Sequence, residues 1–90
     1  MEPEKLRIFL KVAECGSFSK AAAELFISHS TVSRAVSSLE AELGTVLLER
    51  DNAVKGLTPA GEKLSQRARE LLALTEEIVS EIRGMSKTNE

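Results

Sequence analysis

The sequence has no tryptophan, no tyrosine and only three phenylalanines in 90 residues. Proteins that bind single-stranded nucleic acid stack bases on aromatic rings, so this mode of binding is not expected. The single cysteine, Cys15, excludes an internal disulfide and fits a reducing cytoplasm. No apolar run approaches the roughly 20 residues of a membrane span, and the acidic start of the chain is unlike a secretory signal. We therefore expect a cytoplasmic protein with no membrane partner.

Motifs for catalysis and for cofactors are missing as well. The sequence has no glycine-rich phosphate loop, and its one cysteine and one histidine, Cys15 and His29, do not form a metal-ligand cluster. Its serines have no recognisable base beside them that would make a nucleophile. We therefore expect no enzyme activity, no cofactor and no metal.

A surplus of positive charge is also absent. Lysine and arginine total 12 against 14 acidic residues, whereas a strongly basic domain is the usual footprint of DNA binding. The local balance is different, because between Ser17 and Leu39 the only acid is Glu24, against Lys20 and Arg34. The overall charge argues against tight non-specific binding to DNA and leaves room for site-specific binding by a dimer.

What the sequence does contain is helical periodicity, in a chain long enough for one domain. Pro3 suits the first turn of a helix, and Gly16 is suited to end it. The apolar stripe predicted for this first helix is Leu6, Phe9, Leu10 and Ala13.

Two further helices, with a break of about three residues between them, are predicted before Gly44. The first covers residues 19–25 after a capping Ser17 or Ser19, and the second covers residues 28–43 with Ser28 as its N-cap. The apolar face of the second helix is Val32, Ala35, Val36, Leu39 and Leu43. Its polar face is His29, Ser30, Thr31, Ser33, Arg34, Ser37 and Ser38. A helix that buries one side and offers hydroxyls, an arginine and a histidine on the other suits a DNA major groove.

The second half of the chain predicts a hairpin and a long helix. Short strands at residues 46–48 and 54–57 would be joined by a turn at 51–52. Thr58 and Pro59 then form a strong helix start, and the helix would run to about Met85, roughly 40 Å. Its apolar stripe is longer than a small domain can cover, which favours pairing with a second copy. The residues predicted for this dimerisation are Leu64, Ala68, Leu71, Thr75, Ile78, Ile82 and Met85.

Seven short segments, taken in order, resemble the N-terminal DNA-binding region of LysR-type bacterial transcriptional regulators. They are LRIF (6–9), GSFSKAAAEL (16–25), IS (27–28), VSRAV (32–36), LEAELG (39–44), LLER (47–50) and LTPAGE (57–62). The resemblance implies a winged helix-turn-helix followed by a linker helix that forms a homodimer, with higher oligomers left to a full-length protein. In this family a C-terminal domain senses a small-molecule effector, so we expect these residues to be the DNA-binding portion of a longer protein.

The predicted fold is therefore mostly α, with three helices and a short two-stranded wing over residues 1–58, a linker helix over 59–85 and a tail over 86–90. The predicted function is sequence-specific binding of double-stranded DNA, with the recognition helix in the major groove of inverted-repeat half-sites. The residues predicted to contact DNA are Lys20, Ser28, His29, Ser30, Thr31, Ser33, Arg34, Ser37, Ser38, Arg50 and Lys55. The acidic composition and the weakly basic wing keep an alternative open, a dimerisation module that binds a partner protein and has weak or lost DNA binding.

The sequence also departs from the pattern of the family it resembles. His29 and Ser30 stand where the family most often has Gln and Pro, at the start of the recognition helix, so we expect a different preferred DNA sequence. The wing, residues 51–56, has a single lysine, Lys55, where many relatives have several basic residues. Arg50 at the end of the first strand is therefore the stronger prediction for a phosphate contact.

Overall fold

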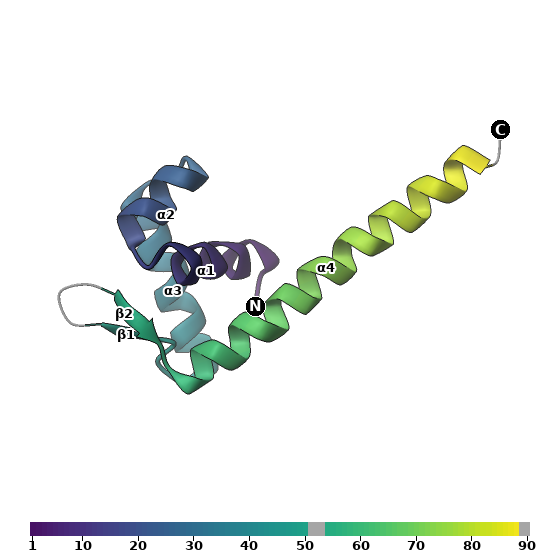
Figure 1. Cartoon of the computed structure of the whole chain (residues 1–90). Helices are drawn as coiled ribbons and strands as arrows, with labels where there is room; N and C mark the ends of the chain where they lie inside the picture. The colour runs from purple at the N-terminus through teal and green to yellow at the C-terminus, as the bar shows by residue number, and fades with distance from the viewer. Residues whose placement is uncertain (51–53, 89–90) are drawn as a thin grey trace.

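The computed structural model describes residues 1–50 and 54–88 of the chain. In order, the elements are α1 (Pro3–Cys15), α2 (Phe18–Leu25), α3 (His29–Leu43), β1 (Leu48–Arg50), β2 (Val54–Leu57) and α4 (Pro59–Thr88). Figure 1 shows three helices and a hairpin gathered in one body, with α4 leaving that body on the side away from the hairpin. The predicted mostly helical fold, a winged helix-turn-helix with a long linker helix, is confirmed.

The ends of the first three helices follow from local sequence chemistry. The Ser17 hydroxyl accepts a hydrogen bond from the backbone N–H of Lys20 at 3.2 Å and caps α2. Gly16 and Gly44 end α1 and α3 in the left-handed conformation that glycine adopts without strain. The end of α2 is different, because Phe26 takes the left-handed conformation there with a φ of 59°. The three residues between α2 and α3 match the predicted break.

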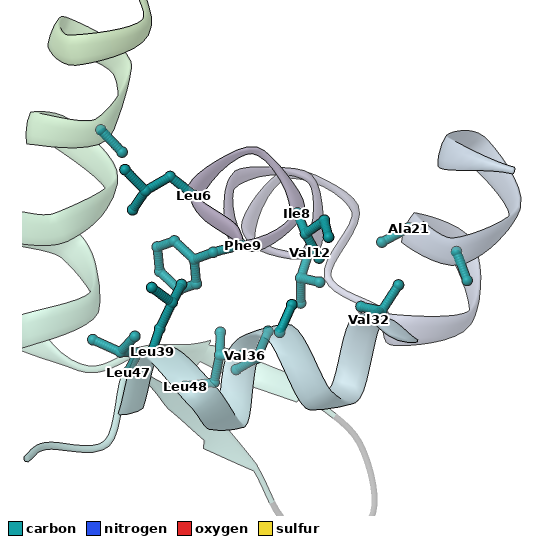
Figure 2. Close-up of a cluster of buried hydrophobic side chains, with 13 residues drawn as sticks. Leu6, Ile8, Phe9, Val12, Ala21, Val32, Val36, Leu39, Leu47 and Leu48 are labelled. Carbon is teal, nitrogen blue, oxygen red and sulfur yellow. The ribbon is translucent and has the colours of Figure 1, made fainter. Parts of the chain in front are cut away.

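The core is built around α1, which packs against α2, α3 and α4, and α3 packs in turn against α2. Leu47 and Leu48, before and at the start of β1, complete it. Figure 2 shows Phe9 of α1 beside Leu39 of α3 and Leu47, the residue before β1. The predicted apolar face of α3 is confirmed at Val32, Ala35, Val36 and Leu39, which are buried. The prediction is wrong for Leu43, which is exposed at the last residue of the helix, where the core has ended.

The buried face of α1 is wider than the sequence predicts, because this helix packs against α2, α3 and α4 at once. Its buried residues are Leu6, Ile8, Phe9 and Val12. Leu10 and Ala13, which the predicted stripe includes, are only half-buried. A single helical period therefore identified two of the four buried positions.

The first strand begins two residues later than predicted. Residues 46 and 47 are held partly by side chains: the Leu47 N–H donates to a Glu40 carboxylate oxygen at 2.8 Å, and the Thr58 hydroxyl donates to the Val46 carbonyl at 2.7 Å. The Leu47 carbonyl accepts a hydrogen bond from the backbone N–H of Thr58, the residue after β2, at 3.1 Å. β1 and β2 then pair antiparallel, with the second strand at its predicted position. The predicted turn at residues 51–52 lies outside the described residues.

The long helix α4 starts as the sequence predicts, since the Thr58 hydroxyl also accepts a hydrogen bond from the Gly61 N–H at 3.0 Å. It continues through Gly84 to Thr88 and so passes the predicted end near Met85. Its length gives the chain a longest dimension of 57 Å, and Figure 1 shows its C-terminal half standing clear of the body. Within the described part of the chain, no helix is both long and apolar enough to cross a membrane.

Candidate nucleic-acid interface

The outward face of α3 is polar and open. Ser30, Arg34 and Ser37 are exposed and recur at intervals of four and three residues, so they form one row along the helix. Among the residues that the structure describes, none forms a hydrogen bond or an ion pair with the Arg34 guanidinium. The burial of Val32 and Val36 on the opposite side fixes the rotation of the helix. The row is therefore presented to solvent by a rigid element.

The beginning of α3 uses some of its hydroxyls for capping. The Ser28 hydroxyl accepts a hydrogen bond from the Thr31 N–H at 3.1 Å and also lies 2.7 Å from the Thr31 hydroxyl. The Ser30 hydroxyl lies 3.2 Å from that of Ser28. The predicted contact residues Ser28 and Thr31 thus have a structural role at the cap. Among the described residues, none accepts a hydrogen bond from the backbone N–H groups of His29 and Ser30, which lie at the positive end of the helix dipole.

Two serines of the predicted polar face lie at its edges. Ser38 is half-buried, and its hydroxyl accepts a hydrogen bond from the Lys5 ammonium at 2.8 Å. This side chain faces α1, because the helical rotation that buries Val36 turns it toward that helix. The assignment of Ser38 to the DNA contact stays a prediction. Ser33 is half-buried on the opposite edge of the row, while Lys20 on α2 is exposed.

Arg50 is the last residue of β1 and pairs with Val54, the first residue of β2, in the wing, the hairpin that these two strands form. Its guanidinium Nη2 is 3.1 Å from a Glu40 carboxylate oxygen, and its Cζ is 5.3 Å from the centre of the Phe18 ring. The Arg50 side chain is 35% exposed. A guanidinium has five N–H donors, so those not used by Glu40 can still reach a phosphate. Lys55 on β2 is exposed.

Glu24 on α2 is the only acid between Ser17 and Leu39, and two side chains of α1 contact its carboxylate. The Cys15 thiol donates to one oxygen of its carboxylate at 3.2 Å, and the Lys11 ammonium is 3.4 Å from the other. The hydrogen bond from Cys15 and then the one from Lys11 lower the pKa of Glu24. The same hydrogen bond raises the pKa of Cys15, with burial adding to it, and Glu14 followed by Glu24 raises the pKa of Lys11. Glu24 and Glu40 are thus both paired within the domain.

The predicted dimerisation stripe on α4 divides into two parts. Ala68 is 2% exposed and belongs to the core of its own chain, and Leu64 is half-buried against that core. The assignment of Ala68 to a dimer interface is therefore corrected, because its methyl group is already covered. The remaining members of the stripe are exposed, namely Leu71, Thr75, Ile78, Ile82 and Met85.

Sequence reasoning missed Phe18. It is the first residue of α2 and packs partly against the core, with its ring centroid 5.8 Å from that of His29 in an edge-on contact. Contacts between separate elements leave no periodic signal, so no pattern in the sequence could have identified this contact. The predicted site residues His29 and Arg50 are brought together on this ring.

A short helix, a three-residue turn, a second helix with an open polar face and a two-stranded wing together define the winged helix-turn-helix class of DNA-binding proteins. Residues 3–62 match the model of one family in particular, described as bacterial regulatory helix-turn-helix protein, lysR family. The chain belongs to this family, as the sequence predicted.

Relatives and solved structures agree with this membership. The chain is 44% identical over 82 residues to the probable HTH-type transcriptional regulator LrrA of Synechococcus elongatus; the match covers 91% of the chain but only 28% of LrrA. It is similar in structure to the DNA-binding domain of BenM in complex with catB site 1 DNA, with 40% identity, a TM-score of 0.89 and 96% of each chain covered. The DNA-binding domain of CbnR in a DNA complex gives 38% identity and a TM-score of 0.88 over 96% of this chain and 99% of that one.

Proposed function

We propose that this chain binds double-stranded DNA at specific sequences, as the DNA-binding and dimerisation part of a LysR-type transcriptional regulator. The observation that carries the proposal is the outward row of Ser30, Arg34 and Ser37 on a helix whose other side is buried. A helix of this kind fits the major groove, where arginine donates to the two acceptors of guanine and serine hydroxyls read several base edges. Solved relatives with the same fold are complexes with DNA.

Phosphate contacts would set the register of α3 in the groove. The candidates are the remaining donors of Arg50, the ammonium groups of Lys20 and Lys55, and the N–H groups at the start of α3. Glu24 on α2 and Glu40 on α3 are each paired with a cation within the domain, which lowers their repulsion of a phosphate backbone. The net negative charge of the chain is therefore compatible with binding through this face.

A homodimer would place two copies of α3 on the half-sites of an inverted repeat, about 34 Å apart along the DNA. The support is the exposed apolar stripe of α4, which one chain leaves uncovered. The chain spans 28% of the length of LrrA, so control by a small-molecule effector belongs to a C-terminal domain of the longer protein. Such a regulator would work in the bacterial cytoplasm, without catalytic activity or a cofactor of its own.

Selection of bound sequences from random DNA is the test that gives both the site and its symmetry. On the selected sequence, Arg34→Ala is expected to weaken binding by roughly 5- to 150-fold and to relax the preference at one base pair in each half-site, because a bidentate base contact contributes about 1–3 kcal/mol. Fluorescence anisotropy measures the affinity.

Arg69→Ala is the matched control. It also removes one exposed arginine, but from α4 and away from the α3 row. If both variants lost the same small amount of affinity at every sequence, α3 would not be the reading element. If the unmodified chain enriched no sequence at all, the alternative of a protein-binding dimerisation module would take its place.

A further inference from the structure

Phe18 lies where α2, α3 and the wing meet. Its ring contacts His29, the first residue of α3, with the two ring planes at 71°. The Arg50 guanidinium lies over the same ring, 5.3 Å from its centre. One side chain therefore contacts both the first residue of the recognition helix and the last residue of β1 in the wing.

The contact continues from Arg50 to the last turn of α3. One oxygen of Glu40 pairs with Arg50, and its other oxygen accepts the Leu47 N–H at 2.8 Å. The Glu40 side chain is only 15% exposed, so its position is restricted. The end of β1 is thus tied to α3 at Glu40 and, through the Phe18 ring, at His29.

This cluster of His29, Phe18, Arg50 and Glu40 lies beside the proposed DNA-reading row. His29 and Glu40 are 11 residues apart, about three helical turns, and so share one flank of α3. The row of exposed side chains at Ser30, Arg34 and Ser37 runs along the neighbouring flank. A movement of the wing that shifts the Arg50 side chain would therefore change the surroundings of His29 through the Phe18 ring, even with no DNA bound.

We propose that Phe18 is a specificity-determining positioning residue, whose ring couples the wing to His29 through Arg50. The position of the wing on the DNA backbone then determines how the His29 side chain is oriented toward the bases in the major groove. Phe18 itself touches no base and acts only through these two neighbours. This proposal rests on the proposed function, because it assumes that both the wing and α3 contact DNA.

The coupling can be measured without DNA, because His29 is the only histidine in the chain and gives a single set of imidazole signals in an NMR spectrum. Phe18→Leu removes the ring and is expected to shift these signals. Arg50→Met removes the cation from the ring and is expected to shift them too, although Arg50 is not the residue in contact with His29. Lys20→Met is the control, since it removes a cation that has no contact with the ring, and it should leave the signals in place.

Methyl signals from the core residues Leu6 and Val36 show whether each variant is folded, and a variant that loses them is replaced by Phe18→Met or Arg50→Gln, which also remove the ring or the cation. If the His29 signals of folded Arg50→Met coincided with those of the unmodified chain, the coupling would be refuted. This outcome is independent of DNA binding, so it separates failure of the coupling from failure of the proposed function.

A double-mutant cycle on the selected DNA sequence tests the consequence for recognition. The effects of His29→Ala and Arg50→Met on the dissociation constant are expected to differ from additivity by about threefold or more, as for side chains that share a packing neighbour. In the Phe18→Leu background this non-additivity should vanish, and Phe18→Tyr, which keeps the ring, should restore it.

Phe18→Leu should also change the base preference at the same position as His29→Ala does, while the preference at the Arg34 position is kept. A merely structural loss would lower affinity at all sequences equally. Additive effects in the native background, or equal coupling with and without the Phe18 ring, would overturn the proposal.

Discussion

The two halves of α4 use the same kind of apolar spacing for different purposes. In the first half the buried residues are small, namely Gly61, Ser65 and Ala68, and they let the helix approach its own domain closely. In the second half the apolar residues are large, and Ile78 and Ile82 are 51% and 61% exposed. The fully buried residues of α4 are thus small and lie in its first half, whereas its large apolar residues are half-buried, as Leu64 is, or exposed.

The physical reason is the distance between the packed elements. A Cβ atom on Gly61 would overlap the carbonyl oxygen of Leu47, so the helix there lies against backbone. At Gly84, in the second half, an added Cβ would meet nothing within 4 Å. The close approach leaves no room for a side chain at Gly61, whereas the surface at Gly84 is open.

Gly61→Ala is expected to have the largest effect on this comparison. The added methyl group cannot be placed without moving α4 from Leu47, so the free energy of unfolding should fall by about 3 kcal/mol. Gly84→Ala, the same change in the same helix, should instead raise it by about 0.5–1 kcal/mol because alanine favours helix. Urea denaturation at one fixed protein concentration measures both. Equal effects would show that the first half does not approach the domain closely.

Ile78→Glu addresses the second half. A carboxylate on the exposed stripe should weaken self-association by about tenfold or more, since an apolar side chain that would be buried between copies becomes charged. Ala73→Glu adds the same charge on roughly the opposite side of α4 and should change little. Sedimentation at low micromolar concentration gives the masses, and identical masses for Ile78→Glu and the unmodified chain would leave the stripe without a role in dimerisation.

Ser65 allows a smaller test within the first half. Its buried hydroxyl has no hydrogen-bond partner among the described residues. Removing an unsatisfied buried polar group relieves a cost of desolvation, so Ser65→Ala should raise stability by up to about 1 kcal/mol. Ser80→Ala, on the exposed half, gains only helix propensity and should raise it less. A loss of stability in Ser65→Ala would mean that the hydroxyl has a partner in solution.

The smallest expected effect concerns the domain on which the first half of α4 packs. There the Glu24 carboxylate on α2 accepts a hydrogen bond from the Cys15 thiol on α1. Because the folded state raises the pKa of Cys15, the stability from this contact is present below the ordinary thiol value, about 8.5, and is lost as the pH rises through the raised pKa. Near pH 8.5, alkylation of Cys15 should therefore be slower in the folded chain than in the unfolded chain. Glu24→Gln should speed it, and Glu14→Gln should speed it much less.

If folded and unfolded chains were alkylated at the same rate, the Cys15 hydrogen bond would not persist in solution. The same pH change should leave self-association unaltered, because the exposed stripe of α4 contains no titratable side chain. If self-association weakened over the same pH range in which Cys15 ionises, the contact between α1 and α2 would be coupled to the exposed stripe of α4, contrary to this comparison.

Much of this architecture could be predicted from local chemistry. The capping hydroxyls of Ser28 and Thr58 and the left-handed glycines Gly16 and Gly44 mark helix ends through contacts within a few residues. Gly61 shows the limit of such reasoning, because local chemistry predicts only that a glycine weakens a helix. Its real constraint comes from Leu47, 14 residues away.

The sequence by itself determined the helices, their caps, the buried side of α3 and the family, because each of these depends on neighbours along the chain or on the order of short motifs. Only the tertiary structure decided that Ser38 turns to Lys5, that Ala68 belongs to its own core, and that Phe18 joins the wing to α3. Periodicity states which face of a helix is apolar or polar. The residues that contact that face depend on how segments distant in the sequence pack together, and no local pattern predicts them.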